Sequence, residues 1–152
     1  MRKTRVFCSG PISGHDFDER YAAFEKRTKL IRLMGYICHH PLEGLIGLRG
    51  SGIVKPTGYG GRAKGSTLVS LSDWNTRRAD ILLVDLAAAK KVISIGTVVE
   101  VSWAFRQAST FVVVFGLEEG DPMYHDFILE QGDLFLPTEE AAMLWLADHA
   151  DA

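Results

Sequence analysis

The sequence has only two cysteines, Cys8 and Cys38, among its 152 residues. Two cysteines are too few for the disulfide framework of a small secreted domain. We therefore expect both thiols to pack as small apolar side chains in a reducing cytoplasm. Long apolar runs are also missing, since the basic start is followed by only three apolar residues before Ser9. Such a run is too short for a signal peptide or a membrane span, so we expect a cytoplasmic protein without a membrane partner.

The chain lacks an excess of charge of either sign, with 17 Lys and Arg against 19 Asp and Glu and a net charge of -2. This balance gives no broad attraction to a nucleic acid polymer, which we exclude as a partner. The five histidines have no metal-ligand spacing, and no P-loop, dinucleotide fingerprint, Cys-x-x-Cys pair or serine-hydrolase elbow is present. We therefore expect neither a metal nor a cofactor.

Apolar runs and amphipathic segments alternate along the chain. Short apolar runs predict strands at 6–8, 36–38, 81–85, 111–115 and 133–136. Helical spacing or helix caps predict helices over 17–34, from Ser72, over 96–108 and over 138–149. Such alternation indicates βαβ units and a parallel sheet. We expect one α/β domain over 1–152, a three-layer Rossmann-like (flavodoxin-like) sandwich with a central, mostly parallel sheet of about five strands.

A glycine-rich window at about 44–67 interrupts this alternation. A loop of this length in a compact domain is commonly functional or disordered. It could form a lid in which Tyr59, Arg62 and Lys64 reach a ligand, or it could be a surface loop. The sequence alone leaves both readings open.

Ligands of parallel sheets bind beyond the carboxyl ends of the strands, which directs attention to the segments that follow them. The first such segment is a Gly-rich loop whose backbone could approach a phosphate or a sugar, although a plain strand-to-helix turn explains it equally well. We take its six residues as candidate substrate-binding residues: Ser9, Gly10, Pro11, Ile12, Ser13 and Gly14.

Three acids are candidate functional residues. Glu100 lies about one turn inside the helix predicted from Gly96, where the helix dipole favours its ionised form. A fixed carboxylate beside a pocket can attack an anomeric carbon, but a solvated first-turn Glu fits the spacing as well. Asp73 could act as a general acid beside Glu100 or could simply cap a helix, and Asp85 ends the central strand as a ligand-binding or loop-orienting residue.

The order of these motifs resembles the nucleoside 2-deoxyribosyltransferase family and its relatives, the deoxynucleoside 5′-monophosphate N-glycosidases. The resemblance covers most of the chain. It depends on the run from Phe7 to Gly14, on Asp73 before the central strand, and on Gly96-Thr97-Val98-Val99-Glu100 followed by Val101-Ser102-Trp103-Ala104. The chain departs from the family where Ser102 and Trp103 replace the usual residues after the nucleophile.

The resemblance implies that Glu100 is the nucleophile at C1′ and that Asp73 helps to protonate the departing base. It places Ser94, Gly96 and Thr97 among the substrate-binding residues with the loop and Asp85. Transferases acting on free nucleosides usually carry an acid six positions before the nucleophile, where this chain has Ser94. A hydroxyl can donate to a phosphate that a carboxylate would repel, so Ser94 favours a 5′-monophosphate substrate.

The resemblance also implies a homodimer, or a dimer-based oligomer, with active sites shared between subunits. His125, after the fourth predicted strand, would then contact the phosphate bound by a neighbouring subunit. We expect hydrolysis of a (2′-deoxy)nucleoside 5′-monophosphate through a covalent glycosyl-Glu100 intermediate. The alternatives are a 2-deoxyribosyltransferase that exchanges bases on free deoxynucleosides and a nucleotide-binding sensor without turnover.

Overall fold

The computed structural model describes residues 2–54, 65–88 and 93–150. Its centre is a five-stranded sheet in the order β2-β1-β3-β4-β5, in which every neighbouring pair of strands is parallel. The strands are β1 (Arg5–Ser9), β2 (Ile37–His39), β3 (Ile81–Asp85), β4 (Phe111–Phe115) and β5 (Leu134–Leu136). The prediction of a parallel α/β sheet of about five strands is confirmed.

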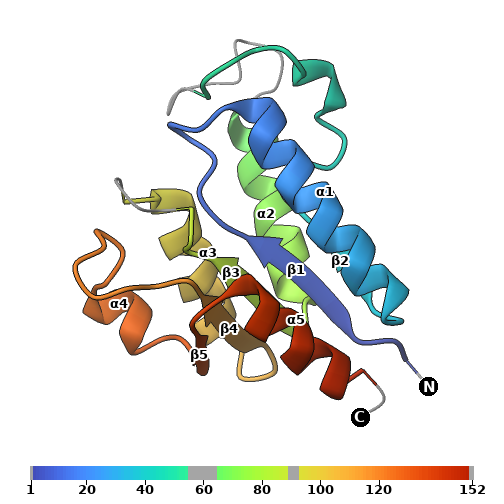
Figure 1. The fold of residues 1–152 in the computed structure, drawn as a ribbon, viewed down its shortest axis with the longest axis vertical. Coiled ribbons are helices and arrows are strands. Elements are labelled where there is room, and N and C mark those ends of the chain that lie inside the picture. Colours follow the sequence, from blue (N-terminus) through green and yellow to red (C-terminus); the bar gives the residue numbers. More distant parts are fainter. Residues whose placement is uncertain (1, 55–64, 89–92, 151–152) are drawn as a thin grey trace.

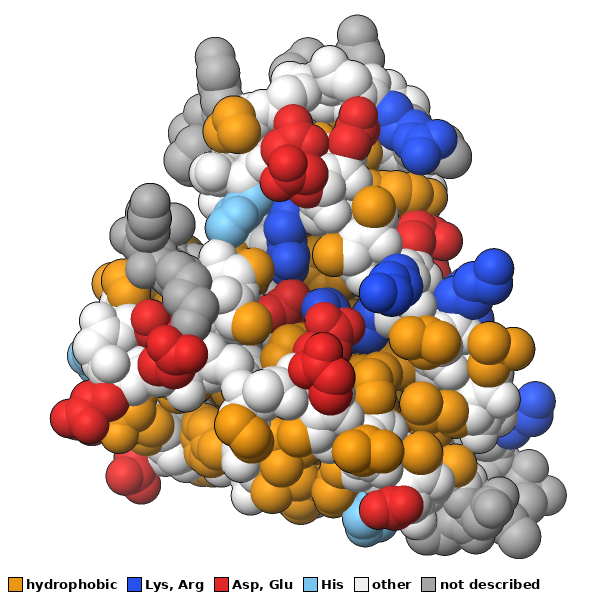
Figure 2. Space-filling view, in the orientation of Figure 1, with side chains coloured by type: hydrophobic (Ala, Val, Ile, Leu, Met, Phe, Trp, Pro, Cys, Tyr) orange, Lys and Arg blue, Asp and Glu red, His pale blue; other side chains and the backbone are white. Residues whose placement is uncertain are grey.

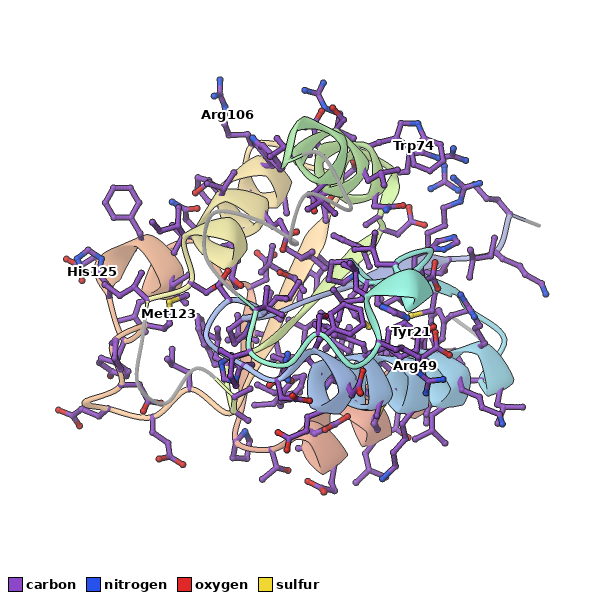
Figure 3. All side chains as sticks on the ribbon, turned by 90° about the horizontal axis from the view of Figure 1, so that it is seen from above. Tyr21, Arg49, Trp74, Arg106, Met123 and His125 are labelled. Atoms are coloured by element: carbon purple, nitrogen blue, oxygen red, sulfur yellow. The ribbon has the colours of Figure 1, made fainter. Side chains whose placement is uncertain are left out.

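Helices cover both faces of this sheet, as Figure 1 and the view from above in Figure 3 show. One face carries α1 (Phe17–Leu33) and α5 (Glu139–Asp148), and the other carries α2 (Gly65–Arg78), α3 (Ile95–Phe105) and the short α4 (Asp126–Leu129). A 3-10 turn, η1 (Ile46–Leu48), follows β2. The three layers form the predicted Rossmann-like sandwich.

The central strand β3 explains why the layers form. All five of its residues are buried, because helices pack on both faces of the sheet and no side chain of the strand can reach solvent. Side chains alternate between the two faces along β3: Leu83 belongs to the core cluster with residues of α1 and α5, and Leu82 to the cluster with residues of α3 and α4. The carboxyl-terminal residues of β1 and β3 consequently lie side by side, with Ser9 paired to Val84.

Most predicted elements agree with the structure to within a few residues, but α2 does not. It begins at Gly65, seven residues before the predicted start at Ser72, so Ser72 and Asp73 lie inside the helix and cap nothing. The first turn of α2 falls within the glycine-rich window, whose composition hides it. The lid residues Tyr59, Arg62 and Lys64 lie outside the described residues.

Both cysteines are buried, and their sulfur atoms lie 3.7 Å apart on the neighbouring strands β1 and β2. They pack with the α1 side of the core, which confirms the prediction that they serve as small apolar side chains. In the described parts of the chain, every helix is too short or too polar to cross a membrane.

Candidate functional site

The candidate site lies at the carboxyl end of β1, where three separate segments meet around one carboxyl group. Glu100 is the sixth residue of α3, and it is only 7% exposed. The hydroxyl of Ser9, the last residue of β1, donates a hydrogen bond to Glu100 Oε2. The side chain of Ser72, in α2, forms a second hydrogen bond with the same carboxyl group. Glu100 is therefore held between a strand and a second helix.

Burial raises the pKa of Glu100 to about 7, against an ordinary value of 4.5, because a carboxylate loses hydration inside the protein. The hydrogen bonds from Ser9 and Ser72 act in the opposite direction but only partly offset this effect. The sequence predicted that the helix dipole favours the ionised form of Glu100, but the larger effect at this position is burial, which raises the pKa. A dipole acts mainly within the first turn, and the sixth residue lies beyond it.

Asp73 is not among the groups bonded to Glu100. Its Oδ1 accepts a hydrogen bond from Arg77 Nε at 2.8 Å, one helical turn further on. Successive residues of an α-helix are rotated by about 100°, so Ser72 and Asp73 cannot both face the same point. Trp74 lies on the side of α2 away from α3 (Figure 3). The residue that α2 directs at Glu100 is Ser72, which the sequence reasoning did not single out.

The loop after β1 is tightly built. The backbone carbonyl of Pro11 accepts a hydrogen bond from Arg20 Nε at 2.8 Å. A Cβ on Gly10 would lie 3.0 Å from Arg20 and from the backbone oxygen of Asp85, so a larger residue at this position would crowd both neighbours. Gly14 has a positive φ of 82° and donates from its N–H to Val54 at 2.8 Å.

The remaining loop residues differ in exposure. Ser9 is fully buried, Ile12 packs partly on the core, and Ser13 is exposed. Asp16 and Ile53 form an isolated antiparallel bridge, which ties the start of α1 to the described beginning of the glycine-rich window. The loop is thus fixed at its base, where Ser9 bonds to Glu100, while Ser13 is exposed to solvent.

Asp85 is held by arginines on the opposite face of the sheet. Its Oδ2 pairs with Arg27 at 2.9 Å and with Arg20 at 3.3 Å, and its side chain is 4% exposed. Arg27 also pairs with Glu139 of α5 at 2.8 Å. Figure 2 shows charged side chains of both signs meeting in the middle of the face covered by α1 and α5. Asp85 thus joins α1 to β3 beneath the loop, and the structure places it with these arginines rather than with Glu100.

The start of α3 brings together three predicted residues. Ser94 is its N-cap, and Ser94 Oγ accepts from the N–H of Thr97 at 3.4 Å and lies 2.9 Å from the Thr97 hydroxyl. Gly96 is exposed, and a Cβ there would meet nothing within 4 Å. Thr97 is buried in the same turn, three residues before Glu100. Free N–H groups and a hydroxyl at a helix start are the donors that an anion requires.

His125 lies apart from these residues in the single chain. It is exposed, caps the short helix α4 by accepting from Phe127 N at 3.3 Å, and points outward at the edge of the molecule (Figure 3). Nearby Met123 is buried, and its sulfur accepts from Ser94 N at 3.3 Å. The segment therefore reaches the start of α3 through Met123, and the role of His125 in a neighbouring subunit stays a prediction.

Two further features bear on where a ligand could bind. A cavity of about 80 Å³ lies between β1, β2 and the carboxyl-terminal half of α2, and Glu100 is not among the residues that line it. Within the described residues, no group of three or more His, Cys, Asp or Glu side chains could hold a metal ion.

The fold resembles two solved structures over almost their whole lengths. The CMP N-glycosidase BcmB of Clostridium botulinum gives a TM-score of 0.55 at 11% sequence identity, covering 96% of this chain and 99% of that chain. A 2-desoxiribosyltransferase from Leishmania mexicana gives a TM-score of 0.61 at 14% identity, covering 96% and 98%. No protein-family model and no curated protein matches the sequence. At these identities the likeness shows the fold, which is the fold implied by the resemblance of the motifs.

Proposed function

We propose that this chain is an enzyme that hydrolyses the N-glycosidic bond of a nucleoside 5′-monophosphate, with Glu100 as the nucleophile. The observation that carries the proposal is the buried Glu100 carboxyl group held between Ser9 and Ser72 at the carboxyl edge of the sheet. A carboxyl group with a raised pKa in such a position is typical of a reactive rather than a purely structural group. The two proteins of similar fold, a CMP N-glycosidase and a 2-desoxiribosyltransferase, are both enzymes, and their activities agree with this proposal.

In the proposed reaction, Glu100 attacks C1′ and forms a covalent glycosyl ester while the base departs. Water then hydrolyses the ester, and the two displacements retain the configuration at C1′. Glu100 must be ionised to attack, so substrate binding or a pH above about 7 has to remove its proton. The hydroxyls of Ser9 and Ser72 stabilise this ionised form.

The start of α3 supports a substrate that carries a 5′-phosphate. Ser94 and the N–H groups of the first turn lie six or fewer residues before Glu100, where they can donate to an anion. A phosphate would replace the side chain of Ser94 as the acceptor for Thr97 N, and the Ser94 hydroxyl could then donate to it. The exposed loop residue Ser13 and the glycines around it would contact the sugar.

Three further parts of the proposal do not depend on contacts within the single chain. Asp73 stays a predicted acid, and it would have to leave Arg77 to reach a substrate. His125 stays a predicted phosphate contact from a neighbouring subunit of a homodimer, which its exposed position at the N-cap of α4 permits. A cytoplasmic location likewise stays a prediction.

The second candidate function is base exchange by a 2-deoxyribosyltransferase, which the similarity in fold to the Leishmania mexicana enzyme favours. Both reactions share the glycosyl ester on Glu100 and differ in the acceptor. A nucleotide sensor without turnover is the remaining alternative. The raised pKa of the buried Glu100 favours an enzyme over this alternative.

A panel of nucleosides and nucleoside 5′-monophosphates, assayed for released base with and without an acceptor base, tests the proposal. We expect release from monophosphates without an acceptor and none by the Glu100→Ala variant. Release only in the presence of an acceptor would establish the transferase. Equal rates with and without the 5′-phosphate would refute the role assigned to Ser94, and binding without any turnover would favour the sensor.

A further inference from the structure

Arg20 is a buried arginine that connects the loop after β1 with the end of β3. It is the fourth residue of α1 and is only 6% exposed. Its Nε donates to the backbone carbonyl of Pro11 at 2.8 Å, and its Nη1 pairs with Asp85 Oδ2 at 3.3 Å. The guanidinium lies over the ring of Phe24, 4.6 Å from the ring centroid, which restrains its plane. A single planar cation thus holds two segments that are far apart in the sequence.

The two segments held by Arg20 border the place where this fold is expected to bind a ligand. The chain passes from β1 to β2 on one side of the sheet and then returns to β3 on the other side of β1, so the strand order reverses between β1 and β3. Ligands of open parallel sheets bind beyond the strand ends at such a reversal. Asp85 is also tied to the segment after β3, because its Oδ1 accepts from Ala88 N at 3.4 Å. The pair of Arg20 and Asp85 therefore links the segments on both sides of this place.

Arg20 acts on the loop beyond the residue that contacts Glu100. Ser9 is the last residue of β1, and pairing with Val84 of β3 fixes its position in the sheet. Pro11 lies two residues further on, outside the strand. A Cβ on Gly10 would lie 3.0 Å from Arg20 Nη2, so the guanidinium packs directly against the loop backbone. Loss of the Arg20 side chain would therefore release the loop and leave Ser9 in the sheet.

Arg27 provides a comparison within the same structure. It lies on the same helix, is 2% exposed, and pairs with the same oxygen of Asp85 at 2.9 Å. Its Nε donates to Glu139 of α5 at 2.8 Å, whereas the Nε of Arg20 donates to the loop. The two arginines share burial, charge and a carboxylate partner, and they differ in the segment that they hold.

We propose that Arg20 is a positioning residue, which fixes the loop after β1 against the end of β3 and so preorganises the loop for the substrate. This inference rests on the proposed function, in which the loop contacts the sugar. A preorganised loop loses less conformational freedom when the substrate binds. Removal of Arg20 should therefore weaken substrate binding. The chemical step should change little, because Glu100 keeps its hydrogen bonds with Ser9 and Ser72.

The test measures KM and kcat for release of base from the best nucleoside 5′-monophosphate of the panel. Wild type, Arg20→Ala, Arg20→Lys and Arg27→Ala are compared after circular dichroism has shown which variants fold. We expect Arg20→Ala to raise KM about tenfold, the effect of about one charge-assisted hydrogen bond, with kcat within about threefold of wild type. Arg20→Lys should also raise KM, because an ammonium group lacks the planar fork that reaches both partners. Arg27→Ala should lower stability and leave KM unchanged.

Guanidinium chloride at millimolar concentration separates positioning from a general loss of stability. The free guanidinium ion fits the space left in Arg20→Ala and should lower the KM of this variant, but not that of Arg27→Ala or wild type. An unchanged KM in both Arg20 variants, or an equal rise in Arg27→Ala, would overturn the inference and leave the proposed function intact. A fall in kcat larger than the rise in KM would also overturn it.

Hydrogen–deuterium exchange measures the loop without any turnover. The backbone amides of residues 12–14 should exchange faster in Arg20→Ala than in Arg27→Ala, and Arg20→Lys takes its place if the alanine variant does not fold. Equal exchange in the two variants would overturn the inference. If the wild type cleaves no nucleotide of the panel, the proposed function itself fails, and the exchange data still decide whether Arg20 fixes the loop.

Discussion

Replacing Glu100 with glutamine should stabilise the protein, and the gain should grow with pH. The folded protein holds a proton on Glu100 up to a pH of about 7, whereas an unfolded chain releases it near 4.5. A raised pKa of an acid means that stability is fully present below the unfolded pKa and is lost as the pH rises through the folded pKa. Glutamine resembles the protonated form and does not titrate.

The size of the effect follows from the shift. At 1.36 kcal/mol per pKa unit, a change from 4.5 to about 7 corresponds to about 3 kcal/mol at pH 8, an upper value since the buried pocket relaxes when the group ionises. At pH 5 the same variant should gain less than about 1 kcal/mol, because the folded wild type is still protonated there.

Urea unfolding followed by tryptophan fluorescence measures this difference at the two pH values. Glu119→Gln, which changes an exposed glutamate, is the matched control and should show no growth between pH 5 and pH 8. If Glu100→Gln changes the free energy of unfolding equally at both pH values, Glu100 titrates normally in the folded protein. If it destabilises the protein at pH 8, the ionised carboxylate is favoured by its surroundings and the reasoning is refuted.

Three other changes test single contacts. Ser9→Ala should lower kcat/KM about tenfold, because the ionised Glu100 loses a hydrogen-bond donor. The same loss should move the acid limb of the pH profile of kcat/KM to higher pH. A pH profile with an unchanged acid limb would contradict this prediction. Asp85→Asn should lower the free energy of unfolding in urea by about 3 kcal/mol, because Arg20 and Arg27 lose the buried carboxylate that they share. Glu139→Gln changes a half-exposed partner of Arg27 and should lower it by less than about 1 kcal/mol. Equal losses in the two variants would show that burial does not decide the strength of these ion pairs. Gly10→Ala should lower the free energy of unfolding by about 1–3 kcal/mol, because the added Cβ crowds its neighbours. Gly96→Ala, which has open space around the added Cβ, should change it by less than about 1 kcal/mol. Equal effects would show that the loop after β1 can move to make room for the Cβ.

The positions of the strands and their parallel direction could be predicted from the sequence, because buried strands leave short apolar runs that alternate here with amphipathic helices. The run at Ile81–Asp85 is buried throughout and occupies the centre of the sheet as expected. The beginning of α2 could not be predicted in the same way. It lies in a glycine-rich window without apolar periodicity, and Ser72 and Asp73 imitate a helix cap although they lie inside the helix.

Glu100, the central residue of the candidate site, could be predicted from the sequence, but the residues that contact it could not. The position of Glu100 in a helix after the central strand pointed to it, whereas its protonation depends on burial by segments far apart in the sequence. Ser72 and Asp73 are adjacent, and only the phase of α2 decides which of them faces Glu100. The partnership of Asp85 with Arg20 and Arg27 is equally nonlocal, since it joins β3 to α1.

The central claim is that Glu100 becomes covalently bonded to the sugar. Incubation with a 2′-fluoro nucleoside 5′-monophosphate, whose fluorine slows breakdown of the glycosyl ester, should increase the mass of the intact protein by one sugar phosphate. Peptide mapping by mass spectrometry should then locate this mass on Glu100, and Glu100→Gln should show none. Release of base by Glu100→Gln at the wild-type rate, or an adduct on another residue, would contradict the account.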